Sequence, residues 1–338
     1  MERMRVVLMR EFVSQGHEVE CLVLQEGGEL DSVARDVVYV HALGARRQRN
    51  AAAAMVKYFR WRRPDAVLGS VWPLSCLVSL SARLAVPKAR VLVSEHNELS
   101  DLTLGSTARR AAKIGFSRVA YGRANAVVAV SKAVAHRLRS THAAAGPVHV
   151  VNNPAYVSAT PRARRERGEP LRFLSVGTLK KVKRHDRLLR AFAAAYPQGP
   201  STLTILGDGE LRESLVRQAA ALGLAERVHF PGFAKDTSSF YQGADVYVHT
   251  ADSEGFGNVL VEALSHGLRV ISTSFPAASE ILRSDDEGVV VPLGDDAALV
   301  NALRQANCSR ERSEAARRRA MDFHPTRIAN KYLDLLFA

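Results

Sequence analysis

The segment from Ala251 to Ala263 reads Ala-Asp-Ser-Glu-Gly-Phe-Gly-Asn-Val-Leu-Val-Glu-Ala, and it decides the fold of the C-terminal half of the chain. A strand-like run, residues 244–250, precedes it, and the apolar spacing of a helix follows it. The order strand, glycine turn, helix is the geometry in which unpaired backbone N–H groups face an anion. Two carboxylates, Glu254 and Glu262, flank this turn, which suits a phosphate that carries a polyhydroxylated group.

Both halves of the chain alternate short apolar strands with helical patterns, such as the helix expected over residues 183–196. The expected strands are residues 18–24, 36–41, 65–69, 90–94, 126–130, 148–151, 173–177, 201–206, 227–230, 244–250, 269–272 and 288–291. Such alternation predicts parallel sheets covered by helices on both faces, with ligands beyond the carboxyl ends of the strands. His96, Gly177, Gly207 and Glu254 each follow such a strand.

The length of 338 residues suits two domains of ordinary size. The stretch over residues 158–170 is rich in Arg, Pro and Gly and has no periodicity, so it predicts the link between them. No apolar run reaches the roughly 18 residues of a membrane span. The three cysteines lie far apart without metal spacing, which is typical of free cytosolic thiols, and we expect a cytoplasmic protein.

The net charge of +13 is uneven, because residues 1–150 hold 22 Lys and Arg against 12 Asp and Glu, whereas residues 151–338 hold 25 against 22. This excess indicates either solvated faces or a surface that meets an anionic partner. An anionic membrane surface or a phosphate-bearing acceptor is favoured over nucleic acid, because the basic residues are scattered and lack interleaved stacking aromatics.

Four segments in order resemble the motifs of one enzyme family. They are Ser175-Val-Gly-Thr-Leu-Lys-Lys-Val-Lys183, Leu206-Gly-Asp-Gly209, Val228-His-Phe-Pro-Gly-Phe233, and the E-x7-E pair Glu254 and Glu262. Together they are similar to the retaining family 4 (group 1) glycosyltransferases of GT-B fold. The resemblance implies two doubly wound Rossmann-like domains that face each other across a cleft.

The resemblance also implies roles for individual residues. Lys183 would stabilise the charge that grows on the diphosphate of a nucleotide-sugar donor, and Glu254 would bind the sugar hydroxyls or support an oxocarbenium charge. Glu262 would accept hydrogen bonds from the ribose. His96 would lie against the donor sugar, with Glu95, Asn97 and Glu98 as candidates for gripping the acceptor. The remaining donor-site residues would be Gly177, Thr178, Gly207, Gly255, Phe256, Gly257, Asn258 and Val259.

These remaining residues differ in what they would contribute. Gly255 and Gly257 would let the backbone approach the donor, and the Phe256 ring would line one side of the sugar site. Four of these functional roles compete with a purely structural interpretation. Glu262 could be a surface helix residue, Lys183 a solvated lysine, Phe256 a core residue and His96 a structural histidine. No Asp-x-Asp pair stands at a strand end, so we expect neither a metal nor a resident cofactor.

Two departures from the family pattern affect the expectation. Relatives usually begin with a strand and a Gly-Gly loop, whereas this chain opens at Met1-Glu2-Arg3. We therefore expect an N-terminal domain without its first strand, from a misplaced start codon or a truncated gene. Thr178 stands where the family usually carries an Arg, so Lys183 alone would supply the side-chain cation that binds the diphosphate. The expected domains are residues 1–157 and 158–321, with a helix in 322–338 that packs back on the first.

These observations predict a retaining glycosyltransferase that moves a sugar from a nucleotide-sugar to a saccharide or lipid-linked acceptor in surface-polysaccharide synthesis. Peripheral contact with the inner membrane face fits the charge of the N-terminal half. Two alternatives remain open: an inactive, truncated protein that binds nucleotide-sugars, and a nucleotide-sugar epimerase of the same fold. The E-x7-E pattern disfavours the epimerase.

Overall fold

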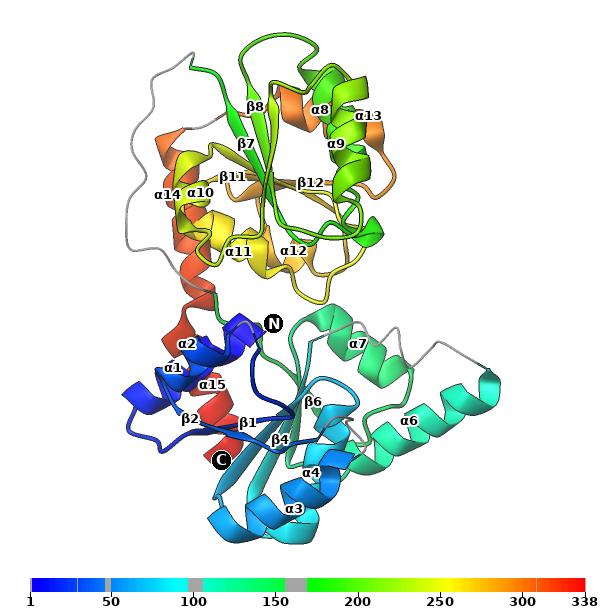
Figure 1. Cartoon of the computed structure of the whole chain (residues 1–338), viewed down its shortest axis with the longest axis vertical. Helices are drawn as coiled ribbons and strands as arrows, with labels where there is room; N and C mark the ends of the chain where they lie inside the picture. Colours follow the sequence, from blue (N-terminus) through cyan, green and yellow to red (C-terminus); the bar gives the residue numbers. More distant parts are fainter. Residues whose placement is uncertain are drawn as a thin grey trace. The chain divides into compact units, whose positions relative to one another are not determined.

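The computed structural model describes residues 2–28, 30–45, 50–96, 106–155, 169–307 and 309–337. The chain divides into two compact units. Unit 1 contains residues 1–154 together with 325–338, and unit 2 contains residues 155–324. Both units are α/β, with strands and helices in alternation along the chain (Figure 1).

Unit 1 contains two parallel sheets. The larger has the strand order β3-β4-β5-β6 and the smaller pairs β1 with β2. The strands are β1 (Glu20–Val23), β2 (Tyr39–Ala42), β3 (Ala66–Ser70), β4 (Arg90–Glu95), β5 (Ala126–Ala129) and β6 (Val148–Val150). Within the described ranges of unit 1, no strand pairing joins the two sheets.

Helices cover both faces of the larger sheet of unit 1. The helices described in unit 1 are α1 (Glu2–Ser14), α2 (Asp31–Arg35), α3 (Ala51–Arg62), α4 (Leu74–Ala85), α6 (Thr107–Tyr121), α7 (Lys132–Ser140) and α15 (Pro325–Phe337), of which α2 packs with α1 and the smaller sheet. Leu92 packs with α1 and α15, whereas its neighbour Val91 packs with α3 and α4. Successive strand residues point to opposite faces, so the two helix pairs lie on opposite sides of the sheet.

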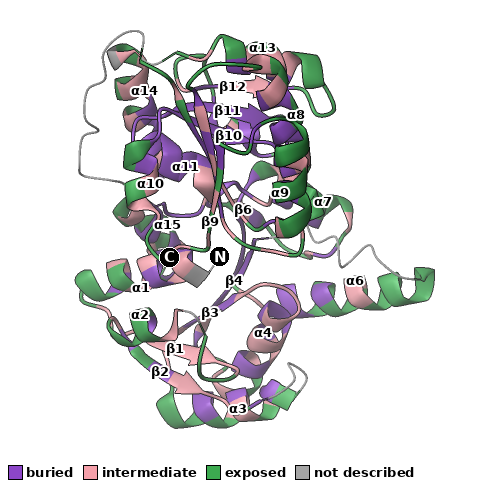
Figure 2. Cartoon of the chain, turned by 45° about the horizontal axis from the view of Figure 1, so that its top comes forward, coloured by how far each residue is buried: buried purple, intermediate pink, exposed green. Residues whose placement is uncertain are grey.

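Unit 2 is built on one six-stranded parallel sheet with the order β12-β11-β10-β7-β8-β9. Its strands are β7 (Arg172–Val176), β8 (Thr202–Leu206), β9 (Val228–Gly232), β10 (Val246–His249), β11 (Arg269–Thr273) and β12 (Gly288–Val291). Every residue of β10 and β11 is buried (Figure 2), as expected for parallel strands that are covered on both faces.

Helices alternate with these strands along unit 2. They are η2 (Lys181–Lys183), α8 (His185–Ala195), α9 (Arg212–Ala221), α10 (Ser238–Gly243), α11 (Asn258–Ser265), α12 (Ala278–Ile281), α13 (Asp296–Arg304), α14 (Arg310–Ala320) and η3 (Met321–Phe323). The side chains of α8 and α13 join those of the central strands in one core, which includes Phe173, Phe192 and Leu299.

The structure differs from the sequence expectation in a few places. The helix expected from residue 183 is split, because Arg184 adopts a left-handed conformation (φ 53°) between the short η2 and α8. Helices α2 and α12 were not expected, since five and four residues are too few to show a helical period. Most of the expected link, residues 158–170, lies outside the described residues.

Candidate active site

The strand order of unit 2 brings several sequence motifs to one edge of its sheet. Strand β7 pairs with β10 on one side and with β8 on the other. The three strands are parallel, so the residues that follow them, Gly177, Gly207 and Thr250, lie at the same carboxyl edge. This is the edge where parallel α/β sheets bind ligands.

Two glycine turns pack directly against each other at this edge. The Gly177 N–H donates to the Leu206 carbonyl at 3.0 Å, and the Gly207 N–H donates to the Gly232 carbonyl at 2.9 Å. Gly207 has a φ of 139°, and a Cβ atom there would lie 2.0 Å from the Gly177 carbonyl oxygen. Only glycine fits at position 207. Because Gly177 and Gly207 have no side chains, the backbone at these two positions is not covered.

Lys183 and Glu254 form an ion pair beside these turns. Their side chains are 18% and 21% exposed, so the pair is shielded yet reachable from solvent. A Cβ on Gly177 would lie 3.7 Å from Lys183 Cε, which places the lysine stem over the first glycine turn. The pair puts a cation and a carboxylate next to the backbone of this turn.

The loop that carries Lys183 is bonded to the end of strand β10. The Thr250 hydroxyl donates a shared hydrogen bond to the carbonyls of Lys183 at 2.9 Å and Arg184 at 3.1 Å. The Asp252 N–H donates to the Val182 carbonyl at 2.9 Å, and the Arg184 guanidinium contacts the Asp252 carboxylate at 3.2 Å. These bonds account for the left-handed Arg184 and fix where Lys183 projects.

A buried histidine stands behind Glu254. His249, the last residue of β10, is 3% exposed, and its Nε2 lies 3.4 Å from Glu254 Oε1. Burial alone would raise the pKa of Glu254, but the interaction with His249 and the charge of Lys183 outweigh it and lower that pKa to about 2. Burial lowers the pKa of His249, so its ring is neutral at pH 7 while Glu254 is ionised.

A second buried histidine, His185, begins α8 and contributes to the same electrostatic environment. Burial, with smaller contributions from His249 and Lys183, lowers its pKa to about 4. Neither histidine stood among the residues predicted from the sequence. The signal that could have found His249 is its position at the end of a strand, five residues before Glu254.

Helix α11 supplies the other part of the site. Gly257, the N-cap residue just before this helix, has a φ of 93°, and a Cβ there would lie 2.7 Å from the Phe275 ring. Gly255 precedes this turn, and Asn258 and Val259 form the first turn of the helix. The N-terminal end of the helix dipole adds positive potential at the strand edge.

Glu262 lies one turn further along α11 and is 9% exposed. Its carboxylate accepts a hydrogen bond of 3.0 Å from the hydroxyl of Tyr241, which is itself almost fully buried. The Tyr241 ring stacks on His266 with the ring centroids 5.1 Å apart. A buried hydrogen bond therefore fixes the orientation of the Glu262 side chain, whereas a side chain on an exposed helix surface would be mobile.

The donor-site candidate Phe256 occupies a position that differs from its expected role. Phe256 is 3% exposed and packs edge-on against Phe323, with the ring centroids 5.6 Å apart. Its apolar ring therefore belongs to the core of unit 2 instead of forming a wall for a sugar, because hydrophobic packing outcompetes solvent contact. Thr178 is exposed on the first glycine turn, where it contributes no charge.

Arg212 is a cation near the second glycine turn that the sequence reasoning missed. Its Nη2 donates to the Phe230 carbonyl at 2.7 Å, whereas its Nη1 is buried without a hydrogen-bond partner. That Nη1 would lie 3.8 Å from a Cβ on Gly232, whose carbonyl bonds Gly207. A buried guanidinium N–H with no acceptor is a candidate for binding an anionic or carbonyl group of a ligand.

His96 lies in unit 1, directly after strand β4. It is 6% exposed, and its Nε2 lies 2.7 Å from Arg5 Nη2 and 2.8 Å from Ser94 Oγ. The Ser94 hydroxyl is also 3.2 Å from that of Tyr332 on α15. Burial and the nearby Arg5 charge hold the pKa of His96 well below its usual range. Because a guanidinium only donates, Nε2 accepts and the neutral ring carries its proton on Nδ1.

Glu95 differs from its expected role at the acceptor. It is completely buried and accepts hydrogen bonds from the Ser75 hydroxyl at 2.5 Å, the Tyr121 hydroxyl at 2.6 Å and the Trp72 backbone at 3.1 Å. Burial raises its pKa. These bonds fix the loop before α4, so Glu95 has a structural role, while Asn97 and Glu98 lie outside the described residues.

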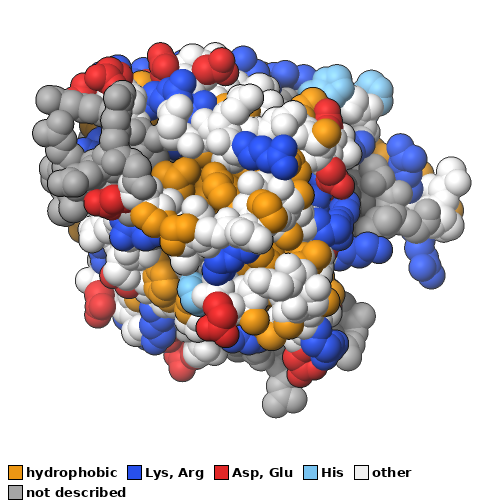
Figure 3. Space-filling model, turned by 90° about the horizontal axis from the view of Figure 1, so that it is seen from above, with side chains coloured by type: hydrophobic (Ala, Val, Ile, Leu, Met, Phe, Trp, Pro, Cys, Tyr) orange, Lys and Arg blue, Asp and Glu red, His pale blue; other side chains and the backbone are white. Residues whose placement is uncertain are grey.

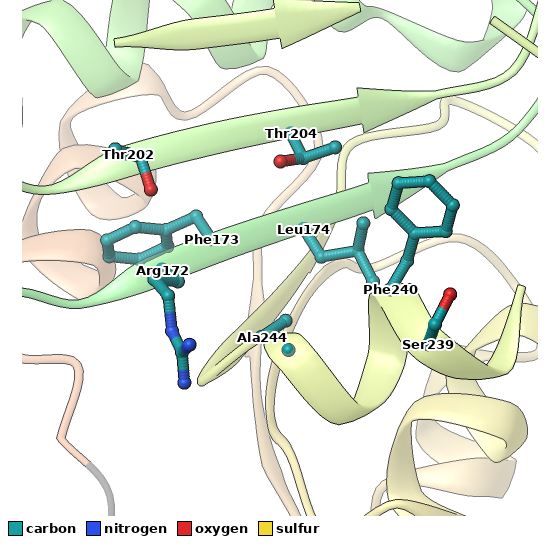
Figure 4. Close-up of a pocket in the computed structure, with 9 residues that line it drawn as sticks. Arg172, Phe173, Leu174, Thr202, Thr204, Ser239, Phe240 and Ala244 are labelled. Carbon is teal, nitrogen blue, oxygen red and sulfur yellow. The ribbon is translucent and has the colours of Figure 1, made fainter. Parts of the chain in front are cut away.

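A separate cavity of about 170 Å³ lies at the start of strands β7 and β8, beside α10 (Figure 4). Arg172, Thr202, Thr204 and Phe240 are among its lining residues. It is away from the glycine turns, which follow the other ends of the same strands, so we do not assign the chemistry to it. Among the residues that the structure describes, no three His, Cys, Asp or Glu side chains are grouped as metal ligands.

Comparison with known proteins identifies the family. A family model of group 1 glycosyl transferases matches residues 158–322, and a model of glycosyltransferase family 4 matches residues 1–158. The chain belongs to the group 1 glycosyltransferases. Because the two matches meet at residue 158, this group 1 glycosyltransferase is covered by family models over residues 1–322.

Several relatives of this group 1 glycosyltransferase are named for the biosynthesis of a lipopolysaccharide core or a polysaccharide. The amylovoran biosynthesis glycosyltransferase AmsD of Erwinia amylovora is 28% identical over 83% of this chain and 80% of that protein. The N-acetylgalactosamine-N,N'-diacetylbacillosaminyl-diphospho-undecaprenol 4-alpha-N-acetylgalactosaminyltransferase of Campylobacter jejuni is 30% identical over 48% of this chain and 46% of that protein. The matches to curated relatives at 30% identity or more span less than half of those proteins' lengths.

Solved structures identify the fold of this group 1 glycosyltransferase. Anabaena HepE in complex with UDP superimposes with a TM-score of 0.82 and 18% identity, over 98% of this chain and 95% of that one. At that identity the likeness shows the fold alone, which is the two-domain, Rossmann-like GT-B fold expected from the motifs. Within the described residues, no helix is both long and apolar enough to span a membrane.

Proposed function

We propose that this protein is a retaining glycosyltransferase that moves a sugar from a nucleotide-sugar donor to a saccharide or lipid-linked acceptor in the synthesis of surface polysaccharide. The observation that carries the proposal is the Lys183–Glu254 pair beside the glycine turns at Gly177 and Gly207. It joins a cation suited to a diphosphate with a carboxylate that stays ionised and can accept hydrogen bonds from a sugar.

The relatives support the choice of substrates. HepE was solved in complex with UDP, and the Campylobacter jejuni relative is named for transfer to a diphospho-undecaprenol saccharide. We extend this chemistry to the present chain as a UDP-type donor and a lipid-linked saccharide acceptor. The excess of positive charge in residues 1–150 supports a cytoplasmic protein in peripheral contact with the inner membrane face.

The proposed reaction breaks the bond between the anomeric carbon of the donor and the diphosphate oxygen and joins that carbon to an acceptor hydroxyl oxygen, whose proton passes to the departing diphosphate or to water. Negative charge grows on the departing diphosphate, and Lys183 with the N–H groups of the first turn of α11 offsets it. Glu254 accepts hydrogen bonds from the donor sugar and opposes the positive charge at the anomeric carbon. Glu262, held by Tyr241, receives the ribose hydroxyls.

The glycines of unit 2 complete the proposed donor site, and His96 of unit 1 stays a separate candidate by resemblance. By resemblance, neutral His96 would contact the donor sugar, and its ring orientation is fixed by Arg5 and Ser94. Gly177, Gly207, Gly255 and Gly257 leave the backbone accessible to the phosphates. Lys183 and the helix N-terminus provide positive charge at the leaving group, so we propose that the reaction needs no metal ion, and turnover should persist with a chelator present.

Glycosyl transfer and donor hydrolysis from a set of UDP- and GDP-sugars test this function. We expect Glu254→Gln to lower kcat about 100-fold, because one preorganised electrostatic contact is typically worth that much. Glu210→Gln, an equivalent change at an exposed carboxylate, should leave kcat unchanged. Wild-type turnover by Glu254→Gln would overturn the site. Nuclear magnetic resonance of the anomeric proton tests retention separately, since an inverted product contradicts that part alone.

A further inference from the structure

Helix α6 of unit 1 extends beyond the elements that support it (Figure 1). Its C-terminal part is fixed, because Ser117 and Tyr121 are buried and the Ala120 carbonyl accepts a 2.7 Å hydrogen bond from Ser79 on α4. Residues 106–112, by contrast, are all exposed, as Figure 2 shows for the free end of the helix. The first two turns therefore have no packing partner among the described residues.

The side of α6 that faces away from α4 is apolar. At 100° per residue, Ala108, Ala112, Phe116 and Val119 fall on one side of the helix, and Ser117, Ala120 and Tyr121 fall on the other. Phe116 is 36% exposed and Val119 is 50% exposed. A surface helix normally presents polar residues to water, so this arrangement is the reverse of the usual one.

Positive charge borders this apolar side. Helices α3, α4 and α6 are packed in one layer, and their sequences contain eight Lys and Arg and no Asp or Glu. Arg109, Arg110 and Arg118 on α6 are exposed and make no ion pair with any residue that the structure describes. In Figure 3, blue side chains are visible on the part that projects to the right, where α6 lies in Figure 1.

An exposed aromatic residue adds to the same helix layer. Trp61, at the end of α3, is 65% exposed, and the guanidinium of Arg62 lies 5.3 Å from its ring centroid. Arg62 itself is paired with Glu18 and Glu20, so it adds no free charge, whereas Arg60 beside it is exposed and unpaired within the described ranges. Tryptophan is the residue that prefers the interface between lipid and water.

We infer that the solvent face of α6 docks unit 1 onto an anionic lipid bilayer. A helix with an apolar face bordered by arginine lies in the plane of a membrane interface, with its apolar side chains among the acyl chains and its cations at the headgroups. Nucleic acid would use the arginines but gain nothing from Val119 and the alanines. The choice of a bilayer rests on the proposed lipid-linked acceptor, but binding to vesicles is measured without donor or transfer.

The test is co-sedimentation of the full chain with vesicles of phosphatidylcholine, alone or with about one third phosphatidylglycerol. We expect binding to the anionic vesicles only, weakened by added salt. The double variant Arg118→Glu and Val119→Ser should bind the anionic vesicles at least tenfold more weakly. Each basic residue near such a surface raises the affinity about fivefold, and replacing a positive by a negative charge changes the affinity by that factor twice.

The matched control makes the same two changes on α9 of unit 2, as Val216→Ser and Arg217→Glu. Val216 is 44% exposed and the Arg217 side chain is 73% exposed, so both variants alter equally accessible residues. The control should bind vesicles like wild type. Unchanged circular dichroism and unchanged UDP affinity of the α6 variant would show that the loss belongs to the surface and not to the fold or the donor site.

Three results would overturn the inference. They are equal binding of wild type to neutral and anionic vesicles, wild-type binding by the α6 variant, and no vesicle binding at all. The single change Val119→Ser separates lipid from other polyanions, because it should lower affinity for anionic vesicles and leave affinity for duplex DNA unchanged. Tight DNA binding with no effect of Val119→Ser on vesicle binding would assign the surface to nucleic acid.

Discussion

Lys183 and Glu254 are in direct contact although 71 residues separate them in the chain. One follows strand β7 and the other follows β10, and these strands are neighbours in the sheet of unit 2. In the free protein each side chain neutralises the other at a partly solvated edge. We expect an incoming diphosphate to take the lysine as its counter-ion, which leaves the ionised Glu254 to accept hydrogen bonds from the sugar.

The first prediction concerns this lysine. Lys183→Ala should weaken UDP binding about tenfold to 100-fold, because a hydrogen bond to a charged group contributes about 1.5–3 kcal/mol. Lys180→Ala removes the same charge from an exposed position on the same loop and should change the affinity little. Isothermal titration calorimetry with UDP measures both. Equal losses in the two variants would mean that only the general positive potential matters.

The second prediction concerns the fit of the two glycine turns. Gly207→Ala should lower the free energy of unfolding by more than about 2 kcal/mol, because the new Cβ would overlap the Gly177 carbonyl. Gly199→Ala is the matched control, since its φ of 104° is also positive but no atom lies within 4 Å of the new Cβ. It should cost about 1 kcal/mol, from backbone strain alone. Equal losses in urea unfolding would contradict the proposed packing.

The third prediction concerns the support of Glu262. Tyr241→Phe removes the hydroxyl that bonds this carboxylate and should raise the KM for the donor several-fold, with a loss of about 1 kcal/mol in stability. Tyr196→Phe removes a hydroxyl bonded at 2.7 Å to the Leu303 carbonyl, away from the strand edge, and should affect stability alone. A KM change of similar size in both variants would contradict a role of the Tyr241–Glu262 hydrogen bond in donor binding.

The fourth prediction is a dependence of stability on pH. Because the pKa of His185 is lowered to about 4 from an unfolded value of about 6.5, the unfolded chain binds more protons between these pH values. The contribution of this group is therefore lost as pH falls from about 6.5 to 4, by up to about 3 kcal/mol. His185→Gln should flatten this slope, whereas His229→Gln, at an exposed histidine, should leave it unchanged.

Denaturant unfolding at a series of pH values measures this slope. Both tryptophans, Trp61 and Trp72, belong to unit 1, so far-ultraviolet circular dichroism is the appropriate probe for unit 2. Glu254 acts in a lower pH window. Because its pKa is lowered to about 2, its contribution to stability is complete above about pH 4.5 and is lost as the pH falls below that value. A wild-type curve that is flat between pH 6.5 and 4 would contradict the burial of neutral His185.

Much of the fold was predictable, because alternating strands and helices with turns at Gly177, Gly207 and Gly257 are visible in local sequence. The family motifs also identified Lys183, Glu254 and Glu262, and the family itself is confirmed. The roles assigned to these three residues stay predictions.

What local patterns could not predict depends on contacts distant in sequence. The interaction of His249 with Glu254 requires knowing which way each side chain points at the sheet edge. The packing of Phe256 on Phe323 and the burial of Glu95 among Ser75 and Tyr121 join segments separated by many residues. The left-handed Arg184, which splits the expected helix, follows from the bonds of Thr250 to the preceding loop.

The same Thr250 bonds have a thermodynamic consequence for ligand capture. Because the loop with Lys183 is already held in the folded protein, its conformational entropy is lost during folding and not when a donor arrives. Donor association should therefore show a small entropic penalty from this loop. Replacing Thr250 by valine would move that penalty into the binding step, where it would be measured as a less favourable binding entropy at a nearly unchanged binding enthalpy.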